Sequence, residues 1–347
     1  MGDPMTRAGY EHLSVYRHEG RQAECDLSDN TNLFGSAPSA LASLAAWSGG
    51  DPARYPTPGN EALRDALGTW LGVSPATIVG GCGSNDILDS AMRALGVPGS
   101  TLAYTAPTFV MTPHFAAANS LKPVPVATRP DGQPDVEGLL ATGAPLIYVA
   151  TPNNPSGAAA SVGRVRLLVD RAPGVVILDE AYTEYLGTSW AEEAAKRDNL
   201  LVTRTFSKAW GLAGLRIGYG VGSTALVREV EKGRGPFKVN AVAEQAATAA
   251  VRHDQAWLDE VVGKTRVIRR ETVRRLRALE WLVADSDANF IAVTVSGAAA
   301  AGAFLASRGI AVRAVTGAPV VGDVLRITIG PEPMMDRLVA AMADLPR

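Results

Sequence analysis

Short runs of aliphatic and β-branched residues alternate with amphipathic stretches through the middle of the chain. The runs predict strands, and the stretches between and before them predict helices. Strands are expected at 101–104, 122–126, 146–150, 175–179 and 200–203, and helices at 84–95, 134–140 and 160–171. Alternation at this spacing indicates an α/β fold, with a mostly parallel sheet covered by helices on both faces.

The C-terminal third has a different pattern. A stretch without proline, 241–278, predicts one long helix that leads out of the first unit. After it, the pattern predicts strands at 281–284, 288–295, 311–315 and 325–329, and helices at 298–307 and 332–345. We therefore expect a large domain over 36–265 and a smaller α+β domain built from 1–35 and 266–347.

Composition narrows the possible partners. The 347 residues are 47% apolar, and 33 basic and 35 acidic residues give a net charge of -2. Like charges form no long run, so neither nucleic acid nor an anionic membrane is an expected partner. The first twenty residues are polar, and no apolar stretch approaches the length of a bilayer span. We expect a cytoplasmic protein. The two cysteines and four histidines lack the spacing of a metal site.

Six arginines crowd the second half of the long helical stretch, at positions 266, 269, 270, 274, 275 and 277. They are interleaved with Val267, Ile268, Val273 and Leu276. This pattern is typical of an amphipathic helix with a solvated basic side. We expect these arginines to face solvent.

Candidate catalytic side chains follow the predicted strands. In open α/β sheets, ligands bind beyond the carboxyl ends of the strands. Lys208 comes shortly after the strand at 200–203, and Arg216 lies eight residues further on. A lysine that is partly desolvated and close to positive charge has an amine neutral enough to attack an aldehyde. Arg216 and the hydroxyls of Thr205 and Ser207 would suit a phosphate.

Two other strand ends carry polar groups. Asp179 closes the strand at 175–179, where a carboxylate can keep a pyridine nitrogen protonated, while Tyr182 offers a hydroxyl. A helix N-cap would also explain the aspartate. Asn154 lies in the Asn- and Pro-rich loop after the strand at 146–150. It could donate to a phenolate oxygen, although the same composition is that of a turn.

The remaining candidates are weaker when taken singly. Gly83, Ser84 and Asn85 open a helix, where backbone N–H groups can approach a phosphate. Phe109 could stack on a ring or fill the core, and Tyr55 could be a surface turn residue. Arg326 and, with a weaker signal, Arg313 are charged residues inside predicted apolar strands. An arginine in such a position needs an anion or an ion-pair partner.

Together, these motifs resemble those of the fold-type-I pyridoxal-phosphate aminotransferases of class I and II. The histidinol-phosphate branch is the most similar, and the resemblance runs in order from 26–30 to 325–330. It implies a seven-stranded, mostly parallel sheet and pyridoxal 5′-phosphate bound to Lys208 as a Schiff base. It also implies Asp179 at the pyridine nitrogen, and Asn154 and Tyr182 at the ring oxygen. The residues implied around the phosphate are Gly83, Ser84, Asn85, Thr205, Ser207 and Arg216.

The same resemblance implies the substrates and the assembly. A small-molecule amino donor, histidinol phosphate, and a 2-oxo acid acceptor, 2-oxoglutarate, would react in histidine biosynthesis. The active unit would be a homodimer, with Tyr55 reaching the cofactor phosphate of the other subunit. The residues expected to bind the substrate are Tyr16, Asn154, Arg313 and Arg326.

Two departures from the family pattern leave alternatives open. Phe109 stands where the stacking residue is usually a tyrosine, so a hydroxyl is missing there. Residues 29–33 read Asp-Asn-Thr-Asn-Leu rather than the more usual Asn-Glu-Asn-Pro form. The form in this chain also resembles that of threonine-phosphate decarboxylases, which share the fold and the cofactor. A lyase of that kind and an aminotransferase for aromatic or specialised amino acids are the alternatives.

Overall fold

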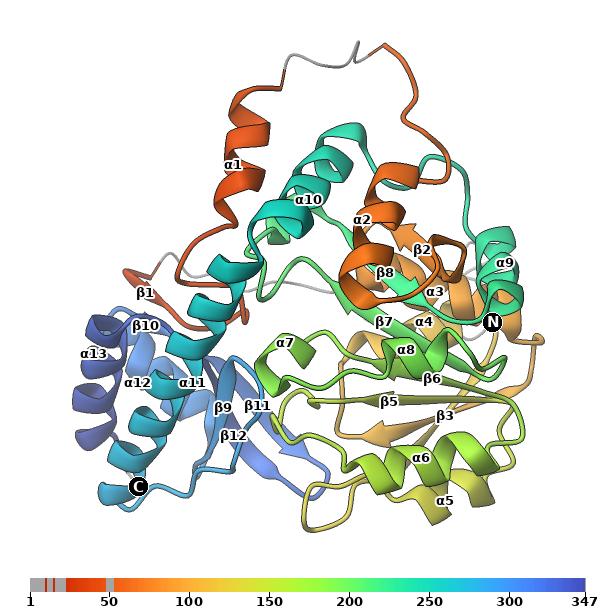
Figure 1. Ribbon diagram of the computed structural model, residues 1–347. Coiled ribbons are helices and arrows are strands. Elements are labelled where there is room, and N and C mark those ends of the chain that lie inside the picture. Colours follow the sequence, from red (N-terminus) through yellow and green to blue (C-terminus); the bar gives the residue numbers. More distant parts are fainter. Residues whose placement is uncertain (1–9, 11–14, 16–22, 48–52, 347) are drawn as a thin grey trace.

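A seven-stranded sheet forms the centre of the computed structural model, which describes residues 10, 15, 23–47 and 53–346 (Figure 1). Its spatial order is β2-β8-β7-β6-β5-β3-β4. The strands are β2 (Ile78–Gly81), β3 (Thr101–Ala106), β4 (Lys122–Ala127), β5 (Leu146–Ala150), β6 (Val175–Asp179), β7 (Leu200–Thr205) and β8 (Gly218–Val221). Within this sheet β8 alone runs antiparallel to its neighbours. The predicted α/β fold is confirmed.

Helices cover both faces of this sheet, because successive strand residues point to opposite faces. Leu178 and Val202 pack into one core and Ile177 and Leu201 into the other. The first core includes α1 (Pro38–Ala45), α2 (Glu61–Leu71), α5 (Val136–Ala141), α6 (Val162–Arg171), α7 (Thr183–Leu186), α8 (Ala191–Ala194) and α10 (Ala241–His253). The second includes α3 (Ser84–Leu95), α4 (Met111–Ala118) and α9 (Thr224–Gly233).

A third core lies beside this layered unit (Figure 1). The antiparallel strands β9 (Phe290–Thr294), β12 (Gly322–Thr328) and β11 (Arg313–Ala318) form its sheet. Three helices pack on it, α11 (Gln255–Ala278), α12 (Ala298–Ser307) and α13 (Glu332–Ala343). β1 (Cys25–Asp26) pairs in parallel with β10 (Ile310–Ala311), which joins the segment after residue 22 to this core. Because α11 contributes to both the first and the third core, the domain boundaries at 36 and 266 stay a prediction. No helix within 23–47 or 53–346 has the length and apolarity needed to cross a membrane.

Several elements differ from the sequence expectation. The long helix is broken at Asp254, whose carboxylate accepts hydrogen bonds from Ser39 N and Ser39 Oγ at 2.8 and 2.6 Å. The prediction of a strand at 281–284 is wrong, because only one isolated bridge forms there, between Val283 and Val293. The strand expected at 311–315 is interrupted at Val312. The sequence pattern missed β2 and β8, because their glycines dilute the apolar run.

β7 presents different chemistry to its two faces. Thr203 donates to the carboxylate of Asp179 on one face, whereas Arg204 points to the other. There Arg204 Nη2 pairs with Glu184 Oε1 at 2.8 Å, and both side chains are almost completely buried. Because Glu184 belongs to α7, two residues after Tyr182, this buried ion pair fixes α7 and Tyr182 against the end of the sheet.

Candidate functional site

Three parallel strands end at the same edge of the sheet and place the main candidates together. Asn154 follows β5, Asp179 is the last residue of β6, and Lys208 follows β7. The three strands are direct neighbours in the order β5, β6, β7. Sequence reasoning predicted this convergence because the apolar runs of these strands are continuous.

Asp179 is a buried carboxylate held by three donors. Tyr148 Oη donates to its Oδ2 at 2.8 Å, and Thr203 Oγ1 and the amide of Ala181 donate to its Oδ1 at 3.2 and 3.1 Å. Burial raises the pKa of Asp179, and these hydrogen bonds oppose that rise. Sequence reasoning missed Tyr148. The available signal was a tyrosine two residues before the end of an otherwise aliphatic strand, on the face that Asp179 shares.

Lys208 lies in an environment that disfavours its charge. Burial lowers the pKa of Lys208 to about 8, and Arg326 and Arg216 act in the same direction. Asp29 and Asp179 oppose this shift. Its Nζ donates to the carbonyl of Asp29 at 3.0 Å and lies 5.8 Å from the ring centroid of Tyr182. Burial and nearby positive charge, the two conditions expected of such a lysine, therefore both act on Lys208.

A segment that sequence reasoning treated only as a departure from a family pattern crosses this site. We call residues 28–36 the N-terminal strap. Asn30 Nδ2 donates to Tyr182 Oη at 3.1 Å, Asn32 Nδ2 to the carbonyl of Ala209 at 2.8 Å and Ser36 Oγ to that of Gly211 at 2.7 Å. Gly211 has φ +69°, and a Cβ there would lie 2.1 Å from the carbonyl oxygen of Gly35. Only glycine lets the strap approach so closely.

The predicted phosphate residues gather beside Lys208. Arg216 Nη1 donates to Ser207 Oγ at 3.4 Å, and a Cβ on Gly83 would lie 3.2 Å from Arg216 Nη2. The amide of Ser207 donates to Thr205 Oγ1 at 3.0 Å. Ser84 and Asn85 are the first residues of α3, which has no side-chain cap. We call this group the cradle. Its guanidinium, hydroxyls and free helix N–H groups suit a phosphate dianion.

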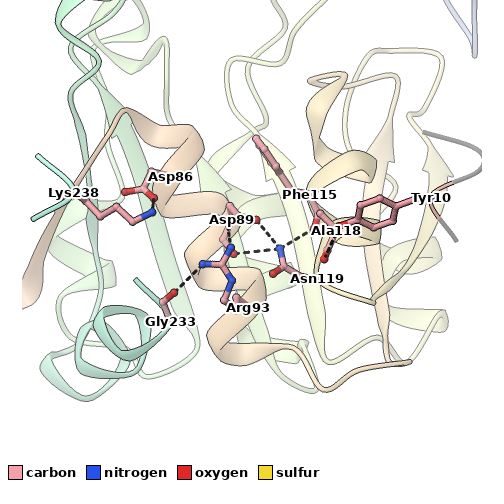
Figure 2. Close-up of polar contacts among 9 residues, drawn as sticks. All are labelled: Tyr10, Asp86, Asp89, Arg93, Phe115, Ala118, Asn119, Gly233 and Lys238. Atoms are coloured by element: carbon pink, nitrogen blue, oxygen red, sulfur yellow. Dashed lines mark hydrogen bonds and ion pairs between the residues drawn. The ribbon is translucent and has the colours of Figure 1, made fainter. Parts of the chain in front are cut away.

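Polar side chains of α3 contact neighbouring segments, among them Asp86 with Lys238 and Asp89 with Asn119 (Figure 2). Asp86 accepts from the amide of Cys82 at 3.0 Å and from Lys238 Nζ at 3.1 Å. Further along α3, Asp89 accepts from Asn119 Nδ2 at 2.7 Å and pairs with Arg93. Asp86 therefore joins the loop before α3 to Lys238.

Arg326 and Arg313 form a second cluster of positive charge. They are direct cross-strand partners on β12 and β11, and like charges in such positions repel each other unless an anion lies between them. Arg326 Nη1 donates to Asn154 Oδ1 at 3.0 Å, and its Nη2 donates to the carbonyl of Ser28 in the strap. The small sheet therefore projects Arg326 to the strand ends of the large sheet.

The other predicted residues lie as follows. Phe109 is partly buried after β3, and its loop is joined to the Asn154 loop by Thr108 Oγ1, which donates to Asn153 Oδ1 at 2.8 Å. Tyr55 is 80% exposed and stacks on Phe237 with ring centroids 4.5 Å apart. It therefore lies on the surface of the single chain. Tyr16 lies outside the described residues.

We expect Lys208 of the cofactor-free protein to be modified by an amine reagent such as acetic anhydride with a midpoint near pH 8. Its pKa of about 8 leaves the folded-state amine neutral above that pH. An unfolded lysine keeps its proton to about pH 10.4. Burial of the charged amine opposes folding, and this cost to the free energy of folding falls as pH rises from about 8 to about 10.4. Peptide mapping by mass spectrometry measures the modification, with the exposed Lys122 as internal reference. Arg326→Gln should raise the midpoint. A wild-type midpoint near pH 10 would contradict the lowered pKa.

Comparison with known proteins identifies one family. Residues 24–342 match the family described as aminotransferase class I and II. The chain is 37% identical over 335 residues to the histidinol-phosphate aminotransferase of Roseiflexus castenholzii, which covers 92% of this chain and 89% of that protein. It is 36% identical to histidinol-phosphate aminotransferase 1 of Thiobacillus denitrificans, over 96% of this chain and 89% of that protein. The crystal structure of histidinol-phosphate aminotransferase from Sinorhizobium meliloti in complex with pyridoxal-5′-phosphate has a TM-score of 0.86 and 31% identity, covering 99% and 98% of the two chains. Fold, site and relatives agree, and the chain belongs to the class I and II aminotransferases.

Proposed function

We propose that this aminotransferase uses pyridoxal 5′-phosphate to transfer an amino group between histidinol phosphate and 2-oxoglutarate in histidine biosynthesis. One observation carries the proposal. Lys208 lies between two clusters of positive charge, the cradle with Arg216 and the pair Arg326 and Arg313, and both Arg216 and Arg326 lower the pKa of its amine. The first cluster suits a cofactor phosphate and the second an acidic group on the substrate. Relatives named for this activity add support.

The residues of the site fit the cofactor. The cradle would hold its phosphate, Asp179 would face its pyridine nitrogen, and Asn154 and Tyr182 would reach its ring oxygen. Phe109, in the loop after β3, would lie against the ring. The buried Asp179 supplies a further reason, because a desolvated carboxylate surrounded by donors is best balanced by a cation, which a protonated pyridine provides. When bound, the cofactor supplies an aldehyde for the lysine and an electron sink for the electrons of the substrate Cα bond.

Each side chain of the site then has a separate role in the proposed reaction. Lys208 would take the proton from the substrate Cα and deliver it to the cofactor carbon that carries the substrate nitrogen, since a pKa of about 8 lets its amine exist in both forms near neutral pH. Asp179 would hold a proton at the pyridine nitrogen. Arg326 and Arg313 orient the acidic group of the substrate. The N-terminal strap, hydrogen-bonded to Tyr182 and Lys208, limits the access of water from its side.

An assay with histidinol phosphate and 2-oxoglutarate should produce glutamate. Arg326→Gln should raise KM for histidinol phosphate about tenfold to a hundredfold, because a hydrogen bond to a charged group contributes about 1.5–3 kcal/mol. The visible absorbance of the lysine-bound cofactor should change little. Arg228→Gln, an exposed substitution on α9, is the matched control and should leave KM unchanged.

The alternatives predict different products. Release of CO₂ from threonine phosphate without any 2-oxo acid would identify a lyase and refute the proposed transfer. Glutamate formation from aromatic amino acids, with none from histidinol phosphate, would keep the aminotransferase and reject the substrate.

Tyr148→Phe tests the support of Asp179. Loss of the 2.8 Å hydrogen bond should raise the pKa of the Asp179 carboxyl further and weaken its hold on the pyridine proton. We expect kcat to fall about tenfold, since this bond to a charged group contributes about 1.5 kcal/mol, with KM for the amino donor nearly unchanged. The pH titration of the cofactor absorbance should shift as well. Tyr104→Phe is the control, because Tyr104 is the cross-strand neighbour of Tyr148 and its hydroxyl makes no hydrogen bond to any described residue. Equal effects of both variants would refute a specific role for Tyr148.

We further propose that the active unit is a homodimer in which Tyr55 reaches the cofactor phosphate of the partner subunit. The exposed stack of Tyr55 on Phe237 supports this, because so large an exposed aromatic pair is typical of an interface. Sedimentation should give a dimer for the wild type, and Tyr55→Phe should weaken cofactor binding without dissociating the dimer. A monomer with full activity would exclude this arrangement. The cytoplasmic location stays a prediction.

A further inference from the structure

A cavity outside the proposed active site lies along the C-terminal half of α11. Its volume is about 410 Å³. One wall is a continuous face of the helix, and the other is the segment that follows it. The lining residues are Arg269, Arg270, Val273, Arg274, Arg277, Asp285 and Ser286. Four arginines therefore face one small volume.

The acids nearby do not balance these arginines. Arg274 is held by both carboxylate oxygens of Glu271, and Arg277 pairs with Asp285 at 2.7 Å. Arg269 and Arg270 form no ion pair with any described carboxylate. Three carboxylates, those of Glu271, Asp285 and Asp287, lie near these four guanidinium groups, which leaves a local excess of positive charge.

Arg269 is the decisive residue. The sequence pattern predicted a solvated arginine, and this prediction is wrong, because Arg269 is only 9% exposed. Its Nη1 donates to the carbonyl of Ala288, a neutral acceptor. Burial lowers the pKa of Arg269, and Arg266 and Arg270 act in the same direction, with Asp287 opposing. A buried charge whose hydrogen bond goes to a neutral acceptor is costly, so a further anion beside it would stabilise it.

We propose that this cavity binds a small polyvalent oxyanion of the phosphate class, held by Arg269 and Arg270. The volume is large enough for a pyrophosphate group, and guanidinium forks suit its oxygens. Ser286 fixes the opposite wall, since its hydroxyl donates to the carbonyl of Phe290 and accepts from the amide of Ala288.

The cavity is also joined to the active-site loop. The amide of Asp287 donates to the carbonyl of Gly157 at 2.8 Å, and Gly157 ends the loop that carries Asn154. A Cβ on Gly157 would lie 2.2 Å from Ser286 Oγ, so the two segments are in close contact. An anion that bridges α11 and residues 285–286 would therefore steady the segment that supports this loop.

Calorimetric titration of the purified full-length protein with pyrophosphate tests the site. We expect a binding event that Arg270→Glu weakens at least tenfold, because a charge-assisted hydrogen bond is replaced by repulsion. Arg270 is exposed and makes no hydrogen bond to a described residue, so this variant should fold. Arg228→Glu on α9, with the same charge change, should bind as the wild type does.

Two further measurements separate this cavity from the active site. The binding event should persist in Arg326→Gln, which removes an active-site guanidinium instead. Hydrogen exchange of the amides at 285–288 should slow on addition of pyrophosphate in the wild type and not in Arg270→Glu. The proposal is overturned if no binding occurs, or if binding is lost in Arg326→Gln and kept in Arg270→Glu.

Discussion

A buried carboxylate held by three hydrogen-bond donors sets the geometry at the end of the central sheet. Asp179 is 6% exposed, and its desolvation is opposed by donors from three places, Tyr148 on β5, Thr203 on β7 and the backbone at Ala181. These donors reach one carboxylate only if β5, β6 and β7 keep their register. The register of the sheet therefore determines the hydrogen bonding at its edge. A shift of β5 or β7 relative to β6 would remove a donor from the Asp179 carboxylate.

The parts of this constraint that are local in the chain could be predicted from the sequence. β5, β6 and β7 are continuous apolar runs, and the polar residues directly after them had to meet at one edge. The glycine-containing strands β2 and β8 could not be found in this way, since half of each lacks an apolar side chain. The break of the long helix at Asp254 was equally hidden, because the residue that binds its carboxylate, Ser39, lies more than two hundred residues earlier in the chain.

The missed parts of the site have the same physical origin. The N-terminal strap reaches Tyr182, Ala209 and Gly211 through hydrogen bonds between residues that are more than 150 positions apart. Periodicity reports only which face of an element is apolar, so it also placed Arg269 in solvent. The tertiary structure buries this arginine because the segment after α11 folds back over the helix, which no local pattern encodes.

The two clusters of positive charge around Lys208 have a consequence for its basicity. Arg326 and Arg216 help to keep the pKa of the lysine at about 8, and both are also the groups best suited to receive anions. An anion bound by Arg326 cancels much of the positive field that the lysine experiences, so the pKa of Lys208 rises towards that of an ordinary lysine. The amine is thus most readily neutral while Arg326 carries no anion, and it is protonated more readily once an anion is held there. A substrate held by Arg326, as proposed above, would therefore leave Lys208 with a stronger affinity for a proton than it has in the empty site.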